Sequence, residues 1–183
     1  MESFNKTIAA ASSLIQVGQN APNFHLASTT ARADQKISLH DFRGLPVVLV
    51  FYPSDWSPIC GNLLAHYNEI MPEFKQQQAR LLGISVDNFW SHLAFSKDNN
   101  LCFPLLSDCE PKGSVAKAYG VFDSTTGMSQ PALFVVNSQG RVHWSHHSTV
   151  EDFPDTHELL EALDLLPKQL AYRISQENTS NLI

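Results

Sequence analysis

Three nearly unbroken runs of apolar residues constrain the fold of this chain more than any other feature. They cover residues 46–52, 81–86 and 132–136, and a shorter run follows at 142–144. A strand with one solvated face alternates between apolar and polar side chains, so continuous runs predict strands that are covered on both faces. Helices have to supply that cover. The pattern therefore predicts an α/β sandwich, in which a central sheet carries helices on both faces.

Helical patterns lie between and after the predicted strands. Apolar residues recur at helical spacing over 63–74, where Pro72 is expected to split or kink the helix. Asp87 or Asn88 can cap the next helix. That helix is expected to bury its first aromatic residues, Phe89 and Trp90. Further elements are predicted as a helix over 113–119, a last helix opened by Pro154 with leucines at 159, 160, 163 and 166, and a hairpin over 24–27 and 37–39.

Composition indicates a single soluble domain without nucleic-acid or membrane partners. The 183 residues are 43% hydrophobic, with 12 basic and 18 acidic side chains and a net charge of −6. A chain this long buries roughly 70% of its extended surface and needs no disulfide or structural metal. No basic run is present to bind a polyanion, and no stretch reaches the roughly 18 to 20 apolar residues of a membrane helix. We expect an N-terminal arm at 1–18, one domain at 19–170 and a C-terminal tail at 171–183.

The three cysteines, Cys60, Cys102 and Cys109, are therefore available for chemistry. Their odd number and irregular spacing argue against a secreted disulfide framework and against a C-x-x-C zinc site. A reducing cytoplasm is the expected location.

Cys60 lies where the first buried strand is expected to run into a helix. Pro58 suits the first helical position, and Ser57 is a preferred N-cap residue, so Cys60 falls in the first turn. Unpaired backbone N–H groups and the positive end of the helix dipole favour a thiolate there, which predicts a nucleophile. The alternative is that Cys60 is a small buried hydrophobic residue.

The spacing Pro53-x-x-x-Ser57-x-x-Cys60 at the end of a buried strand resembles the peroxidatic loop of the peroxiredoxins, the alkyl hydroperoxide reductase and thiol-specific antioxidant family. Similar blocks occur in the same order at 40–44, 83–87, 103–108, 118–121 and 134–140, so the resemblance covers roughly residues 20 to 165. Details at 55–58, 71–74 and 90–92 are most similar to the one-cysteine alkyl hydroperoxide reductase E type. The implied fold is a thioredoxin-like three-layer sandwich with a mixed central sheet.

The resemblance also implies a reaction. Cys60 attacks a hydroperoxide and becomes a sulfenic acid, Ser57 hydrogen-bonds the peroxide and the sulfur, and Pro53 shields the sulfur from water. No cofactor is implied. The implied partners are a hydroperoxide substrate, an external thiol or redoxin reductant, and a second copy of the chain in a homodimer.

Two positions depart from the family pattern. The family places an arginine where this chain has Pro131, and the next residue outward, Gln130, offers a hydrogen bond but no charge. Many members carry Glu where this chain has Leu63. Losing one preorganised donor typically slows a reaction by a factor of roughly 10² to 10³, so a slow peroxidase is expected. Pro131 can be a cis-proline, as in thioredoxins, or an ordinary residue at the start of a strand.

Family members with a resolving cysteine often place it five residues after the peroxidatic cysteine or near the C-terminus. In this chain residue 65 is Ala, and no cysteine follows Cys109. This favours a one-cysteine cycle, with Cys102 and Cys109 left as unorthodox resolving candidates. Two other functions stay open: a peroxide-responsive redox sensor, and a thioredoxin-like thiol-disulfide protein with little peroxidase turnover.

Histidines gather at His143, His146 and His147, which raises the question of a metal site. Alternation along a strand sends His146 to the face opposite the other two, and no carboxylate or cysteine is spaced with them. We therefore predict no metal.

Overall fold

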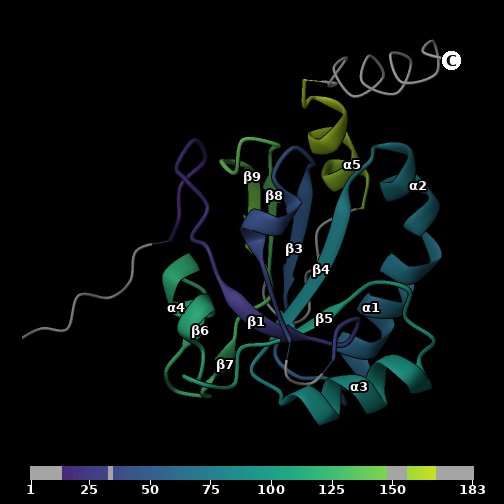
Figure 1. Ribbon diagram of the computed structural model, residues 1–183, viewed down its shortest axis with the longest axis vertical. Coiled ribbons are helices and arrows are strands. Elements are labelled where there is room, and N and C mark those ends of the chain that lie inside the picture. Colours follow the sequence, from purple (N-terminus) through teal and green to yellow (C-terminus); the bar gives the residue numbers. More distant parts are fainter. Residues whose placement is uncertain (1–13, 33–34, 148–155, 168–183) are drawn as a thin grey trace, which may run out of the picture.

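The computed structural model describes residues 14–32, 35–147 and 156–167. Its centre is a seven-stranded sheet in the order β2-β1-β5-β4-β3-β8-β9, which Figure 1 shows between its helices. β3, β4 and β5 run parallel, whereas β8 pairs with β3 in the antiparallel sense. The strands are β1 His25–Ser28, β2 Lys36–Ser38, β3 Val47–Phe51, β4 Arg80–Ser85, β5 Leu105–Ser107, β8 Ala132–Val136 and β9 Val142–His147, and a separate hairpin joins β6 Phe122–Asp123 to β7 Met128–Ser129.

Helices cover both faces of the sheet, as the apolar runs predict. The helical elements are η1 Leu39–Phe42, α1 Pro58–Glu69, α2 Met71–Gln76, α3 Phe89–Asp98, α4 Ser114–Tyr119 and α5 Thr156–Asp164. Side chains of α1, α2, α3 and α5 share one core cluster, and those of η1 and α4 share the other (Figure 1). Every residue of β3 and β8 is buried between these clusters. The predicted sandwich with a mixed sheet is confirmed.

Most of the predicted elements are found close to their expected positions. The hairpin of β1 and β2 is present, and the helix predicted over 63–74 is divided at Ile70 into α1 and α2, with Pro72 in the first turn of α2. Asn88 caps α3 by accepting hydrogen bonds from the amides of Trp90 and Ser91. Pro154 lies outside the described residues, and so do the outer parts of the expected arm and tail.

The prediction for the buried face of α3 is wrong. Trp90 is 68% exposed, and the helix instead buries His92 and Phe95. Apolar spacing alone selected the aromatic pair at the start of the helix, but a histidine with buried hydrogen-bonding partners occupies the inner face. Among the helices in the described part of the chain, none is long and apolar enough to cross a membrane.

Candidate active site

The candidate site lies at the edge of the sheet where the parallel strands β3, β4 and β5 end. The chain leaves β3, forms a loop over 52–57 and enters α1, whose first residue is Pro58. Ser57 is the N-cap in extended conformation (φ −71°, ψ 128°), and its carbonyl accepts the first helical hydrogen bond from the Gly61 amide at 2.9 Å. Cys60 is therefore the third helical residue, as predicted.

The first turn of α1 supplies the surroundings that a thiolate needs. The amides of Ile59 and Cys60 precede the first intrahelical bond, so they are free to point toward an anion. The Ser57 hydroxyl makes no cap hydrogen bond and stays available for a ligand. Pro53 and Ser57 are half-buried, whereas Cys60 is 0% exposed. In this closed arrangement the sulfur is covered by protein.

Pro131 lies at the same edge, immediately before β8, the strand next to β3. The pairing of Phe51 with Ala132 places Pro131 beside the residue at which the 52–57 loop begins. Among the described residues the cis peptide bond is Glu110–Pro111, so the bond before Pro131 is trans and the cis-proline alternative is wrong. Pro131 is an ordinary residue at the start of β8, held in the core, while Gln130 is exposed.

Arginines lie at the opposite edge of the sheet. Arg80 begins β4, Arg43 donates to the carbonyl of Gln139, and Arg141 donates to the carbonyl of Gly18. None of these three side chains replaces the family arginine beside Pro131. Leu63, which stands where many family members carry Glu, is an apolar residue buried in the cluster that contains Cys60. It supplies no charge to the site.

The structure separates Cys102 from Cys60. Cys102 is exposed, and its backbone amide and its Sγ both donate to Oδ1 of Asn68, at 2.7 and 2.9 Å. Asn68 lies eight residues beyond Cys60 on α1, a separation of about 12 Å along a helix. Disulfide formation needs Cα atoms closer than about 7 Å. Cys102 is therefore poorly placed to resolve Cys60.

Cys109 lies at the same edge of the sheet as Cys60. It follows β5, which β4 separates from β3, and it is half-buried. Two strand spacings amount to about 10 Å. Of the two resolving candidates, Cys109 is the one that shares an edge with the site.

A buried polar network joins the loop to α3, and the sequence analysis missed it. Asp55, which is 0% exposed, accepts hydrogen bonds from the hydroxyls of Tyr52 at 2.8 Å and Ser91 at 2.7 Å. Its two oxygens lie 2.8 and 3.0 Å from Nδ1 of His92. Three donors from two elements thus converge on one carboxylate.

His92 completes this network with its second ring nitrogen. Nε2 lies 3.1 Å from the carbonyl oxygen of Leu106, a group that can only accept. Both ring nitrogens therefore face oxygen atoms. The Asp55 carboxyl group and the His92 ring lie in direct contact at 2.8 Å, and both side chains are 0% exposed.

Tyr52 contributes a phenol hydroxyl to the network. Burial raises the pKa of Tyr52 well above its ordinary value, and the negative charge of Asp55 adds to that effect. The phenol accordingly stays protonated and acts as a donor to the carboxylate.

Asp87 fixes the backbone of the loop beneath this network. Its Oδ2 accepts from the Asp55 amide at 3.0 Å and from the Ser85 hydroxyl at 2.6 Å, and its carbonyl accepts from the Ser107 hydroxyl. Ser85 ends β4 and Ser107 ends β5. The loop after β3 is therefore tied to the ends of β4 and β5.

Trp56 makes the outer contact between the loop and α3. Its indole is 57% exposed, but Nε1 donates to Ser91 Oγ at 3.2 Å and the ring meets Phe95 edge to face with centroids 5.2 Å apart. These contacts give Trp56 a packing role in the loop. A sequence signal existed for the α3 side of the contact alone: Ser91, His92 and Phe95 repeat at helical spacing on one face of α3.

The histidines of β9 point to different sides. His146 stacks on Trp144 at 5.9 Å, whereas His147 lies against Phe134 at 5.6 Å. Burial lowers the pKa of His147, and His146 contributes to the same shift. Within residues 14–32, 35–147 and 156–167, no group of three or more His, Cys, Asp or Glu side chains is arranged to hold a metal ion.

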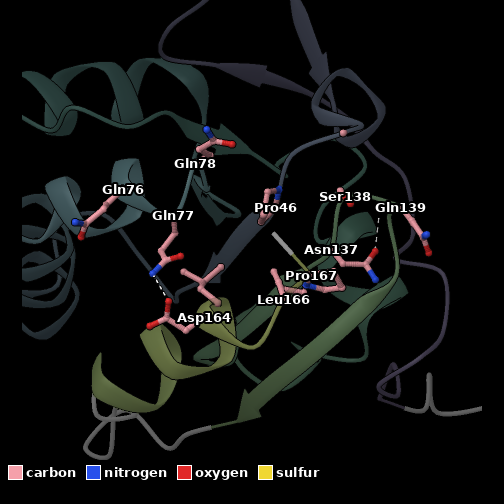
Figure 2. Close-up of a pocket in the computed structure, with 12 residues that line it drawn as sticks. Pro46, Gln76, Gln77, Gln78, Asn137, Ser138, Gln139, Asp164, Leu166 and Pro167 are labelled. Carbon is pink, nitrogen blue, oxygen red and sulfur yellow. Dashed lines mark hydrogen bonds between the residues drawn. The ribbon is translucent and has the colours of Figure 1, made fainter. Parts of the chain in front are cut away.

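A pocket of about 730 Å³ lies at the opposite edge of the sheet, as Figure 2 shows. Its walls come from the start of β3 at Pro46, the turn after β8, the end of α2 and the end of α5. Amide side chains dominate it, and Gln77 donates to Asp164 across it at 2.6 Å. None of the three cysteines lines this pocket, so it is separate from the candidate site.

Comparisons with known proteins agree with this arrangement. A family model described as the AhpC/TSA family matches residues 17–145. Alkyl hydroperoxide reductase E of Mycobacterium bovis is 34% identical over 133 residues, which make up 72% of this chain and 85% of that protein. Peroxiredoxin-2 of Mus musculus is 32% identical over 163 residues, covering 85% of this chain and 80% of that one.

Solved structures show the same relationship. The reduced 2-Cys peroxiredoxin of Plasmodium vivax has a TM-score of 0.74 at 27% identity, with 81% of this chain and 80% of that chain covered. Peroxidoxin BcpB from Mycobacterium tuberculosis has a TM-score of 0.73 at 27% identity, with 84% and 99% covered. The chain therefore belongs to the AhpC/TSA family, the peroxiredoxins, and has their thioredoxin-like fold.

Proposed function

We propose that Cys60 is the peroxide-reducing nucleophile of this thiol-dependent peroxidase. The observation that carries the proposal is the position of Cys60 in the first turn of α1, next to amides that precede the first helical hydrogen bond. Anions are stabilised at such a position by the free N–H groups and the helix dipole. The Ser57 hydroxyl, without a cap bond of its own, is available to orient the peroxide.

The reaction is a displacement on oxygen. The Cys60 thiolate donates an electron pair to the terminal oxygen of the hydroperoxide, an S–O bond forms, and the O–O bond breaks. The leaving alkoxide or hydroxide takes a proton and departs as alcohol or water. Sulfur is oxidised by two electrons to a sulfenic acid. Backbone amides at the start of α1 stabilise the charge that develops on the oxygens.

A one-cysteine cycle returns the sulfur to its reduced state. An external thiol attacks the sulfenic sulfur, releasing water and leaving a mixed disulfide, and a second thiol displaces Cys60 from it. The contacts of Cys102 with Asn68, at the far end of α1, support an external reductant. The homodimer implied by family resemblance stays a prediction, to which Trp56, Ile59 and Trp90 offer exposed apolar surface, and so does the cytoplasmic location.

We expect a slow enzyme, because neither Pro131 nor Gln130 carries a charge. Loss of one preorganised donor corresponds to a rate lower by a factor of roughly 10² to 10³. A slow oxidation step is also what a redox sensor would show, so turnover has to be measured directly.

The test is hydrogen peroxide consumption with dithiothreitol as the reductant. The wild-type chain is expected to turn over, and Cys60→Ser is expected to fall to the rate of dithiothreitol alone. The matched control, Cys102→Ser with Cys109→Ser, is expected to keep its turnover. Turnover in Cys60→Ser would refute the assignment, and loss of turnover in the control would refute the one-cysteine cycle. Stoichiometric oxidation of Cys60 without turnover would instead identify a sensor.

A further inference from the structure

The pocket at the edge of the sheet opposite Cys60 is a feature that the proposed function does not use. Its volume of about 730 Å³ lies within the range of roughly 300 to 1,000 Å³ that is typical of ligand sites. One wall is formed by Gln76, Gln77 and Gln78 at the end of α2, and another by residues 137–139 in the turn between β8 and β9. We call it the amide pocket, because amide side chains come from both walls (Figure 2).

Two of these amide side chains bond to the protein itself. Gln77 donates to Oδ1 of Asp164 at 2.6 Å. Oδ1 of Asn137 accepts from the backbone amides of Gln139 and Arg141, each at 3.0 Å. These two side chains therefore shape the walls of the pocket.

Four further polar side chains at the amide pocket are available to a ligand. In the described part of the chain, the side chains of Gln76, Gln78, Ser138 and Gln139 make no hydrogen bond to another residue. Each glutamine amide presents a donor and an acceptor in one plane, which is the pair of groups that a peptide bond presents. Both walls can therefore bond the main chain of an extended peptide.

The backbone of Gln78 gives an independent indication that its side chain is used. Its φ is 55°, and it follows the C-cap residue of α2. Glycine is preferred at this position, because a side chain at positive φ is strained. Strained residues of this kind cluster at functional sites. The turn does not account for a glutamine here, whereas a pocket that uses its amide does.

The charges around the amide pocket select among ligands. Within residues 14–32, 35–147 and 156–167, no Lys, Arg or His side chain lines it, so no cation is available to bind a phosphate or a carboxylate. Its charged lining residue is Asp164, and the whole chain has a net charge of −6. The same described residues place no aromatic ring in the lining, so a nucleobase finds no stacking surface. A neutral or cationic ligand is therefore favoured.

Apolar residues complete the lining of the pocket. They include Pro46, Leu163 and Leu166, and Figure 2 shows Pro46 and Leu166 between the two rows of polar side chains. Successive side chains of an extended peptide point to opposite sides. Small apolar side chains of such a peptide can therefore face Pro46 and Leu166 while its main chain meets the amides.

We propose that the amide pocket binds an extended segment of a partner polypeptide that is neutral or basic. The side chains of Gln76, Gln78 and Gln139 bond its main chain, and the carboxylate of Asp164 disfavours acidic side chains. This inference goes beyond the proposed function, since binding requires neither Cys60 nor a peroxide. Cys60→Ser is therefore expected to bind the segment with unchanged affinity, whatever its peroxidase activity is.

The test is an NMR titration of the ¹⁵N-labelled full chain with three blocked hexapeptides, in which alanine alternates with glutamine, lysine or glutamate. The side-chain NH₂ signals of Gln76 and Gln78 report binding. The glutamine and lysine peptides are expected to shift these signals saturably, and the glutamate peptide is expected to bind at least about tenfold more weakly. No saturation by any peptide below about 10 mM would overturn the proposal. Equal affinity for the glutamate peptide, or tighter binding of maltotriose as a neutral sugar, would overturn it as well.

Gln78→Gly separates binding from folding, because it removes the amide side chain and relieves the strained backbone. It is expected to unfold at a temperature no lower than the wild type does, and to bind the glutamine peptide about threefold to tenfold more weakly. The matched control, Gln35→Ala, alters an exposed glutamine away from the pocket and is expected to change the affinity by less than about twofold. Unchanged affinity in Gln78→Gly, or an equal loss in the control, would overturn the proposal. If Gln78→Gly does not fold, Gln76→Ser decides by the same criterion.

The competing occupant is the chain's own sequence at 168–183, which continues from Pro167 in the pocket lining. The same labelled protein distinguishes the two occupants without any peptide. Backbone signals of 168–183 are expected to be equal in the wild type and in Gln78→Gly. A shift of these signals in Gln78→Gly would show that the chain fills its own pocket and would overturn the partner segment.

Discussion

Asp55 and Asp108 form a natural comparison, because both are fully buried and both lie at the edge where the parallel strands end. Asp108 caps α4, accepting hydrogen bonds from the amides of Val115 and Ala116 at 2.9 to 3.0 Å and from the Ser114 hydroxyl. Asp55 accepts from side chains of β3's end and of α3 instead. Most partners of Asp108 are backbone amides of one helix, whereas those of Asp55 are side chains that come from two separate segments.

The first prediction tests whether Asp55 depends on His92 as its partner. His92→Ala is expected to lower the free energy of unfolding by about 3–5 kcal/mol, since it removes the ring that contacts both oxygens of this buried carboxyl group. Denaturant unfolding at neutral pH measures the loss. Adding Asp55→Asn to His92→Ala removes the carboxyl group that has lost its partner and is expected to recover part of the stability. A double variant less stable than His92→Ala alone would refute the dependence of Asp55 on His92.

The second prediction concerns the backbone partners of Asp108. Asp108→Asn is expected to lower the free energy of unfolding by about 1–3 kcal/mol. Both carboxylate oxygens of Asp108 accept from backbone N–H groups, whereas the side-chain NH₂ group of Asn would face one of these N–H donors. The same denaturant series measures it. Asp108→Glu tests the geometry with the charge kept. An unchanged stability in Asp108→Asn would mean that the cap contributes nothing, and the comparison with Asp55 would fail.

The smallest expected effect is a pH dependence that belongs to Asp108. Burial raises the pKa of this carboxyl, against the lowering effect of the Ala116 and Val115 amides and the Ser114 hydroxyl. The folded state then takes up a proton at higher pH than the unfolded chain does, so this group adds stability as the pH falls from the raised value toward about 3.9. The difference in unfolding free energy between wild type and Asp108→Asn is therefore expected to grow from pH 7 to pH 4. A difference that shrinks over this range would show that folding lowers the pKa of Asp108 instead of raising it.

The sequence was sufficient for the sheet and for the helix start that precedes Cys60 because both depend on local patterns. Continuous apolar runs predicted the buried strands β3, β4 and β8, and the order Ser57, Pro58, Cys60 predicted the helix start. The resemblance to peroxiredoxins then predicted the fold, which the solved relatives confirm.

The buried polar network around Asp55 could not be predicted because its members meet only in three dimensions. Asp55 and His92 are 37 residues apart, and the accepting carbonyl of Leu106 belongs to a third element. An apolar stripe also favoured Trp90 over His92 as the inner residue of α3, since sequence patterns do not show which polar side chains find buried partners. The position of Cys102 against Asn68 depends likewise on how the segment after α3 meets α1.

The indole of Trp56 has an optical consequence. The chain contains three tryptophans, and Trp56 is the one on the segment that carries Cys60. Its Nε1–H bond to Ser91 and its contact with Phe95 join that segment to α3. Loss of these contacts would transfer the indole to water and shift its fluorescence emission to longer wavelength, so Trp56 is an intrinsic optical probe of the contact between the segment and α3.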